Sequence, residues 1–91
     1  MNKNVSKLEN PTEEDRTTTK ELRQTLEQYT NLFANDPLID DETKVDEILT
    51  LYGNYEYLSK NVIAKDVAQK MINGLKDLIE FTLIIHLYFC L

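Results

Sequence analysis

Apolar side chains recur every three or four residues along most of the chain. The first such series is Leu22, Leu26, Tyr29 and Phe33, and mostly polar residues lie between its members. Residues three and four apart share one face of an α-helix, so this spacing is typical of an amphipathic helix. The series predicts a helix over about residues 12–35, whose apolar seam needs another helical surface because such a helix is marginal alone in water.

The sequence also contains start and stop signals for this helix. Thr12 offers a hydroxyl for the N-cap, and the three acidic residues that follow stabilise the positive end of the helix dipole. Pro37 lacks an amide hydrogen and disfavours helical geometry in the residue before it, which predicts a turn over residues 36–40. Asp40 or Asp41 can then cap the next helix.

A second apolar series extends at helical spacing from Val45 to Leu78. It predicts one long or bent helix over about residues 41–73. Gly53 and Gly74 are its weak points, because a glycine inside a helix costs about 1 kcal/mol relative to alanine. We expect a bend at Gly53, and Gly74 is a candidate helix end because glycine commonly follows a helix C-terminus.

The last part of the chain is strongly apolar. Between residues 78 and 91, Glu80 is the only acidic or basic residue apart from the titratable His86. We expect an apolar helical segment over residues 75–90 that continues the last helix, and apolar residues on every face predict that it is buried all round. Residues 78–91 can contact a membrane but are too short to span one, because a spanning helix needs about 20 apolar residues.

These elements predict a mainly α-helical fold, either an antiparallel helical hairpin or a small three-helix bundle with coiled-coil-like seams. Residues 1–11 are polar and lack periodicity, which predicts a disordered, flexible N-terminal arm. Residues 12–91 are expected to form a single helical domain, because a chain of 91 residues can build only one small core.

Composition and charge exclude several classes of function. Sixteen acidic and ten basic side chains give a formal net charge of -6, so no direct contact with the phosphate backbone of a nucleic acid is expected. A catalytic nucleophile and base would need histidine beside serine or cysteine, and the only histidine, His86, lies in the apolar segment. His86 and Cys90 supply two ligands, fewer than a closed metal site requires. We therefore expect no enzyme, no cofactor and no metal site.

The beginning of the chain and its cysteine content bear on the cellular compartment. The first ten residues lack the run of about 7 to 15 apolar residues found in a secretory signal peptide. The single cysteine allows no disulfide within the chain. Both features predict an intracellular protein, either cytoplasmic or nuclear.

The C-terminal third is more apolar than the first helix can cover, and an exposed apolar patch generally marks a binding surface. We therefore predict a non-enzymatic protein–protein interaction module, a small acidic helical subunit of a larger multi-protein assembly. Its partner is expected to be another helical chain, in a homo-oligomer or a hetero-oligomer. The predicted partner-binding residues are Leu22, Leu26, Tyr29, Phe33, Tyr52, Tyr55, Leu58, Val62, Met71, Leu75 and Leu78.

In length and helical periodicity the chain resembles the small subunits of multi-protein helical assemblies and, more loosely, bacteriocin immunity bundles. The second resemblance implies an alternative function, that of a small membrane-associated protective or regulatory helical bundle. In that case the apolar residues 78–91 would make the membrane contact.

Overall fold

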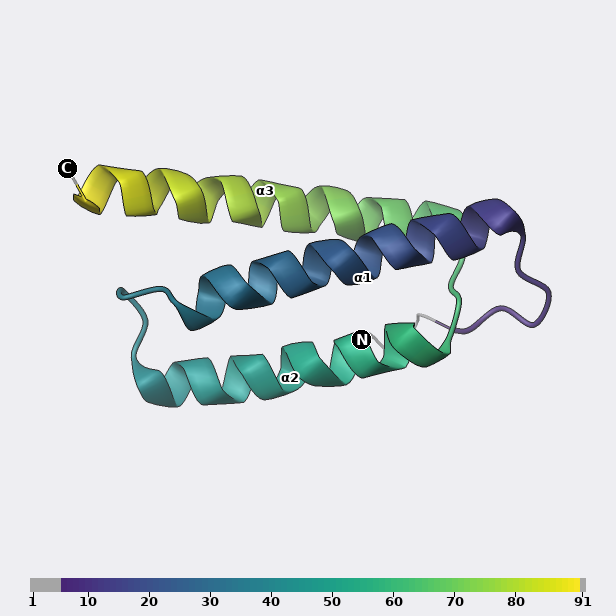
Figure 1. Ribbon diagram of the computed structural model, residues 1–91, viewed down its shortest axis with the longest axis horizontal. Helices are drawn as coiled ribbons and strands as arrows, with labels where there is room; N and C mark the ends of the chain where they lie inside the picture. The colour runs from purple at the N-terminus through teal and green to yellow at the C-terminus, as the bar shows by residue number, and fades with distance from the viewer. Residues whose placement is uncertain (1–5, 91) are drawn as a thin grey trace.

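The computed structural model describes residues 6–90 and arranges them in three α-helices (Figure 1). These are α1 (Glu13–Ala34), α2 (Asp41–Lys60) and α3 (Lys65–Cys90), and the described residues contain no β-strand. The predicted mainly α-helical class is confirmed. Of the two predicted architectures, the chain adopts the small three-helix bundle.

The helix α1 lies in the middle of the bundle. The other two helices pack on either side of it, and within residues 6–90 the backbones of α2 and α3 do not come close to each other. α1 and α3 run in the same direction, whereas α2 runs in the opposite one (Figure 1). The molecule is elongated, with dimensions of 48 × 23 × 17 Å. Between the outer helices, Leu22 and Leu26 of α1 are nevertheless buried in one core cluster with residues of α2 and α3.

Short polar side chains begin the first two helices. At α1, the Thr12 hydroxyl accepts a hydrogen bond from the Asp15 amide at 3.1 Å, and the Asp15 carboxylate accepts one from the Thr12 amide at 2.9 Å. At α2, the Asp40 carboxylate accepts a hydrogen bond from the Thr43 amide at 2.7 Å. The predicted turn lies between the two helices, and Asp40 is the cap of the two candidates.

The position of the second helix break differs from the prediction. α2 ends at Lys60, and a non-helical connection over residues 61–64 separates it from α3, which corrects the single helix expected over residues 41–73. Neither glycine interrupts a helix: Gly53 lies inside α2 and Gly74 lies inside α3. The chain therefore has one break, at residues 61–64, in place of the bend expected at Gly53 and the helix end expected at Gly74.

This break is stabilised by a contact with α1. The side chain of Ile63 enters the core, where the residue is 1% exposed. The buried Thr19 hydroxyl accepts a hydrogen bond from the Ile63 amide at 3.1 Å and donates one to the Ile63 carbonyl at 3.3 Å. Both backbone groups of Ile63 thus find partners outside a helix, which removes the usual penalty for leaving buried polar groups unpaired.

The continuity of α2 predicts the effect of Gly53→Ala. No atom lies within 4 Å of the place that a β-carbon would occupy at Gly53. Alanine is the better helix former, so we expect the free energy of unfolding to rise by about 1 kcal/mol. Urea unfolding followed by circular dichroism measures the change. A variant that unfolds at lower urea than the wild type would show that α2 needs a bend there.

The core runs along α1. Leu22 and Leu26 are buried, while Tyr29 and Phe33 are half-buried, so the predicted seam faces inward along its whole length. Threonines share this interior, since Thr18, Thr19 and Thr25 are buried as well. The buried apolar residues are Leu22, Leu26, Leu51, Leu58, Ile63, Ala68, Ile72 and Ile79.

The predicted N-terminal arm is described only from residue 6 onward, and residues 1–5 lie outside the described residues. Residues 6–11 are not helical. The Leu8 amide donates a hydrogen bond to the Val62 carbonyl at 2.8 Å, which holds this segment against the connection between α2 and α3.

Asp15 joins the beginnings of α1 and α3, and this predicts a pH effect. Hydrogen bonds from the backbone amides of Thr12 and then Lys65, at 2.9 Å each, hold the pKa of Asp15 below its usual value. A lowered folded-state pKa gives stability that is complete above the usual aspartate pKa of about 3.9 and is lost as the pH falls through the folded value. Urea titrations of Asp15→Asn and wild type should therefore differ at neutral pH and converge in acid.

A matched control is Glu13→Gln, which removes a neighbouring carboxylate that makes no hydrogen bond within residues 6–90. We expect its stability to follow that of the wild type more closely across the acid range. If Asp15→Asn retained its full stability deficit at the acid end, the deficit would come from lost helix capping and not from ionisation.

Candidate functional site

An open groove lies between α2 and α3, with α1 as its floor. It encloses about 390 Å³ and is called the α2–α3 groove below. Leu22, Leu26 and Tyr29 form the floor. The walls consist of Glu47, Leu51, Asn54 and Leu58 from α2, and of Met71, Gly74, Leu75 and Leu78 from α3.

The directions of the three helices give the groove two different ends. At one end Leu22 and Leu58 meet, and there the Arg23 guanidinium donates a hydrogen bond to the Leu58 carbonyl at 3.3 Å. At the other end lie Tyr29 and Glu47. The groove is therefore apolar along its floor, and Glu47, its only charged lining residue, lies at one end.

The pKa of Tyr29 reflects both its burial and the negative charge at the end of the groove near Glu47. Burial raises the pKa of Tyr29 above its usual value, and the negative charges of Glu47 and Asp36 raise it further. Its ring also contacts Phe33, with 6.1 Å between the ring centres, so the aromatic floor continues past the groove. Besides burial, Glu47 in α2 and Asp36 in the turn between α1 and α2 thus both raise the pKa of Tyr29, the last residue of the groove floor.

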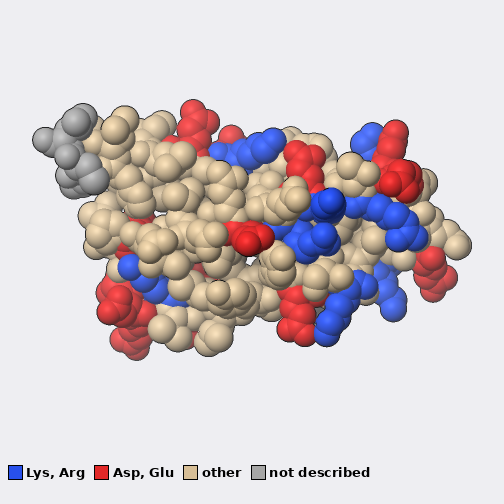
Figure 2. Space-filling view, in the orientation of Figure 1, with Lys and Arg blue, Asp and Glu red and all other residues tan. Residues whose placement is uncertain are grey.

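More carboxylates surround this end of the molecule. Between residues 35 and 47 the chain carries six acidic side chains and a single lysine, Lys44. Figure 2 shows red side chains around the start of α2 with a blue one among them, further red side chains spread over the face, and most of the blue ones over the opposite half. The acidic residues are Asp36, Asp40, Asp41, Glu42, Asp46 and Glu47.

A second apolar surface covers the C-terminal half of α3. Its members are called the tail patch, and all five are exposed, from 48% to 77%: Phe81, Leu83, Ile84, Leu87 and Tyr88. This corrects the expectation that the segment is buried all round. α1 covers only one side of it, the side of Ile79 and His86, and no other described helix packs against α3.

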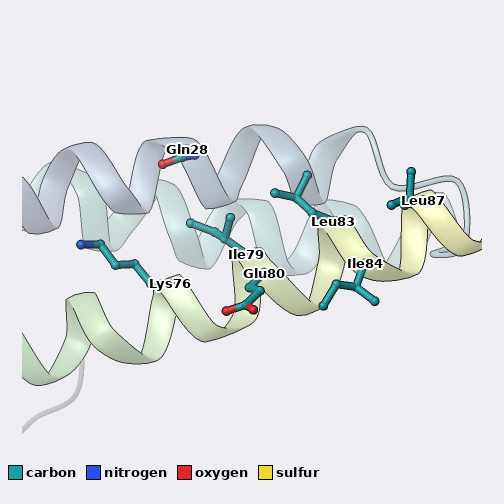
Figure 3. Close-up of a pocket in the computed structure, with 7 residues that line it drawn as sticks. All are labelled: Gln28, Lys76, Ile79, Glu80, Leu83, Ile84 and Leu87. Atoms are coloured by element: carbon teal, nitrogen blue, oxygen red, sulfur yellow. The ribbon is translucent and has the colours of Figure 1, made fainter.

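The tail patch borders a pocket of about 450 Å³ between α3 and α1 (Figure 3). Leu83 and Leu87 point from α3 toward the side of α1, whereas Glu80 and Ile84 point away from it. Gln28 of α1 forms part of the far wall. The apolar lining of this pocket comes from α3 alone, whereas all three helices contribute apolar residues to the α2–α3 groove.

The structure brings seven of the predicted partner-binding residues into the α2–α3 groove. Three of the seven, Leu22, Leu26 and Leu58, are also buried core residues. Leu78 is 48% exposed on the wall. The complete set of seven is Leu22, Leu26, Tyr29, Leu58, Met71, Leu75 and Leu78.

The remaining four predicted residues lie elsewhere. Tyr52 and Tyr55 line a separate pocket of about 190 Å³ between α1 and α2, together with polar residues of α1. Phe33 contacts Tyr29 beyond the end of the groove. Val62 belongs to the connection that precedes α3, where its carbonyl binds the Leu8 amide.

Sequence reasoning missed four wall residues of the groove: Glu47, Leu51, Asn54 and Gly74. The polar pair gave no signal, because acidic and amide residues on a predicted helix are ordinarily solvent-facing. Gly74 was interpreted as a helix end, whereas it lies within the wall. Only the placement of α2 and α3 around α1 assigns these residues to one surface.

No metal site is visible in the part of the chain whose side chains are described: no group of three or more histidine, cysteine, aspartate or glutamate residues is close enough to hold an ion. The Nε2 atom of His86 lies 3.3 Å from a carboxylate oxygen of Asp36, which also accepts a hydrogen bond from the Leu38 amide. The side chain of Cys90, the second of the two ligand-type residues named from the sequence, lies outside the described residues. No helix within residues 6–90 is long and apolar enough to cross a membrane.

No protein-family model, curated protein or solved structure matches the chain. The α2–α3 groove, the acidic end and the tail patch are therefore the observations that bear on function.

Proposed function

We propose that the chain is a non-enzymatic protein–protein interaction module whose α2–α3 groove accepts a helix from another chain. The observation that carries the proposal is the open groove itself: the backbones of two outer helices flank α1 at a distance from each other, and the floor between them is apolar. Helix-in-groove recognition uses this geometry, with anchors at positions i, i+3, i+4 and i+7 of the bound helix.

A fourth helix in this position would complete a four-helix arrangement around the seam of α1. It would cover the half-buried Tyr29, Met71 and Leu75 and the exposed Leu78. Burial of one leucine side chain contributes about 1.5 to 3 kcal/mol, so a few such contacts suffice for measurable binding.

The test uses three matched leucine-to-glutamine variants of the full chain. Leu78→Gln alters the groove wall, Leu87→Gln alters the tail patch, and Leu49→Gln alters the outer side of α2, where Leu49 is 65% exposed. A display library of amphipathic helical peptides is selected on the wild type, and the affinities of the selected peptides are measured by fluorescence anisotropy.

We expect Leu78→Gln to weaken binding more than tenfold, with little change in Leu49→Gln. Thermal unfolding by circular dichroism confirms that each variant is folded. Selection of no peptide, or equal binding to all three variants, would contradict the proposal.

The tail patch supports a second candidate function, membrane association. Five large apolar side chains exposed on one helix end could lie on a bilayer surface. Flotation of the chain with liposomes tests this, and the candidate requires Leu87→Gln to float less than Leu49→Gln. A wild type that stays in the non-floating fraction would dispose of it.

A further inference from the structure

The charges around the α2–α3 groove specify its occupant. We propose that the groove binds an amphipathic helix of a different protein, whose lysine or arginine residues cluster at the end that lies beside Tyr29 and Glu47. The proposal rests on the proposed function and adds the chemistry and the placement of the partner.

The acidic end of the groove supplies the first argument. Glu47 forms part of the groove wall, and it acts together with Asp36 on the phenol of Tyr29 in the floor. The α1–α2 turn and the first turns of α2 add four further carboxylates in the same part of the chain, against Lys44 alone. A helix that carried acidic residues here would meet like charges, whereas a basic end would be attracted.

The opposite end of the groove supplies the second argument. No charged residue lines that end, because Glu47, the only charged group among the wall and floor residues, is at the other end. Basic residues on a bound helix would therefore be attracted at the Glu47 end and would find no carboxylate in the lining of the other end. A bound helix with basic residues at one end and an apolar middle therefore matches the groove along its length.

A second copy of this chain does not fit that description. The chain has a net charge of -6, so self-association would bring a second excess of negative charge to an acidic surface. Its most apolar helical stretch, residues 78–90, contains Glu80 and neither lysine nor arginine. The partner must supply the cluster of basic residues that residues 78–90 lack.

The experiment measures binding of the full chain to three synthetic helical peptides that share one leucine seam. The first carries three lysines at one end, the second three glutamines and the third three glutamates. Exposed charge pairs contribute modestly, so we expect the lysine peptide to bind about fivefold more tightly than the glutamine peptide and the glutamate peptide to bind most weakly. The difference should narrow as sodium chloride is raised, because salt screens exposed charges.

Two charge-reversal variants locate the effect. Glu47→Lys should reduce or reverse the preference for the lysine peptide, whereas Glu9→Lys changes the net charge equally but lies outside the groove and should retain it. Leu78→Gln should weaken all three peptides alike, because it alters the apolar wall only.

Equal affinities for the lysine and glutamate peptides would overturn the assignment of a basic partner and leave the proposed function standing. So would a homodimer in light scattering that Leu78→Gln dissociates, because the groove would then hold a second copy. A preference that Glu9→Lys and Glu47→Lys change equally would also overturn it. Binding of none of the peptides would overturn both proposals.

Discussion

Leu22→Ala is expected to lower the free energy of unfolding by about 3 kcal/mol. Leu22 is 2% exposed and belongs to the same core cluster as Leu58 of α2 and Ile72 of α3, so its removal leaves a cavity between the middle helix and both of its neighbours. A domain of this size has about 5 to 10 kcal/mol of stability in total, so the loss is a large share of it. Urea unfolding followed by circular dichroism measures the change.

The matched control is Leu49→Ala. This leucine is 65% exposed on α2, so the same substitution removes little buried surface and should change stability by less than about 0.5 kcal/mol. Similar losses in the two variants would mean that the middle of the bundle is not packed as described.

The second large effect is expected for Thr19→Val, which should cost about 2 kcal/mol. Valine has nearly the shape of threonine, but it removes the hydroxyl that pairs with both the amide and the carbonyl of Ile63. These two backbone groups would then lie in a buried position without partners. Thermal and urea unfolding measure the loss.

Two control variants separate the effect of losing the Thr19 hydroxyl from the effect of changing the shape of the side chain. Thr19→Ser retains the hydrogen-bonding group and should recover much of the stability lost in Thr19→Val. Thr18→Val should be close to neutral, because the Thr18 hydroxyl donates only to the Glu14 carbonyl one turn earlier in its own helix. Equal costs for Thr18→Val and Thr19→Val would rule out a special role for the contact with Ile63.

The fold could be predicted from sequence where local signals decided it. The seam from Leu22 to Phe33 and the caps at Thr12 and Asp40 are each formed by residues that are close together in the sequence. As a result, α1 begins and ends within one residue of the expectation. The break between α2 and α3 depends on Thr19, more than forty residues from Ile63. Two glycines, each a local signal, predicted breaks that the packed helices do not have.

The candidate site shows the same difference between what local sequence signals predict and what the packing of distant residues decides. Spacing identified most of the floor and the α3 wall of the groove, because the residues that face a core also face any opening beside it. It could not show that Leu26 is 5% exposed, so a substitution such as Leu26→Asp would unfold the chain instead of testing a binding face. Which polar residues stand at the rim depends on the placement of α2 and α3, and the sequence contains no signal for that.

The central position of α1 has a consequence for amide hydrogen exchange. Each outer helix packs on α1 alone, so either one can detach while the other keeps its contacts. Backbone amides in α2 and in the exposed end of α3 should then take up deuterium through separate partial openings. Those of α1 become accessible only when both neighbours have left, and their exchange rates therefore report the stability of the whole molecule.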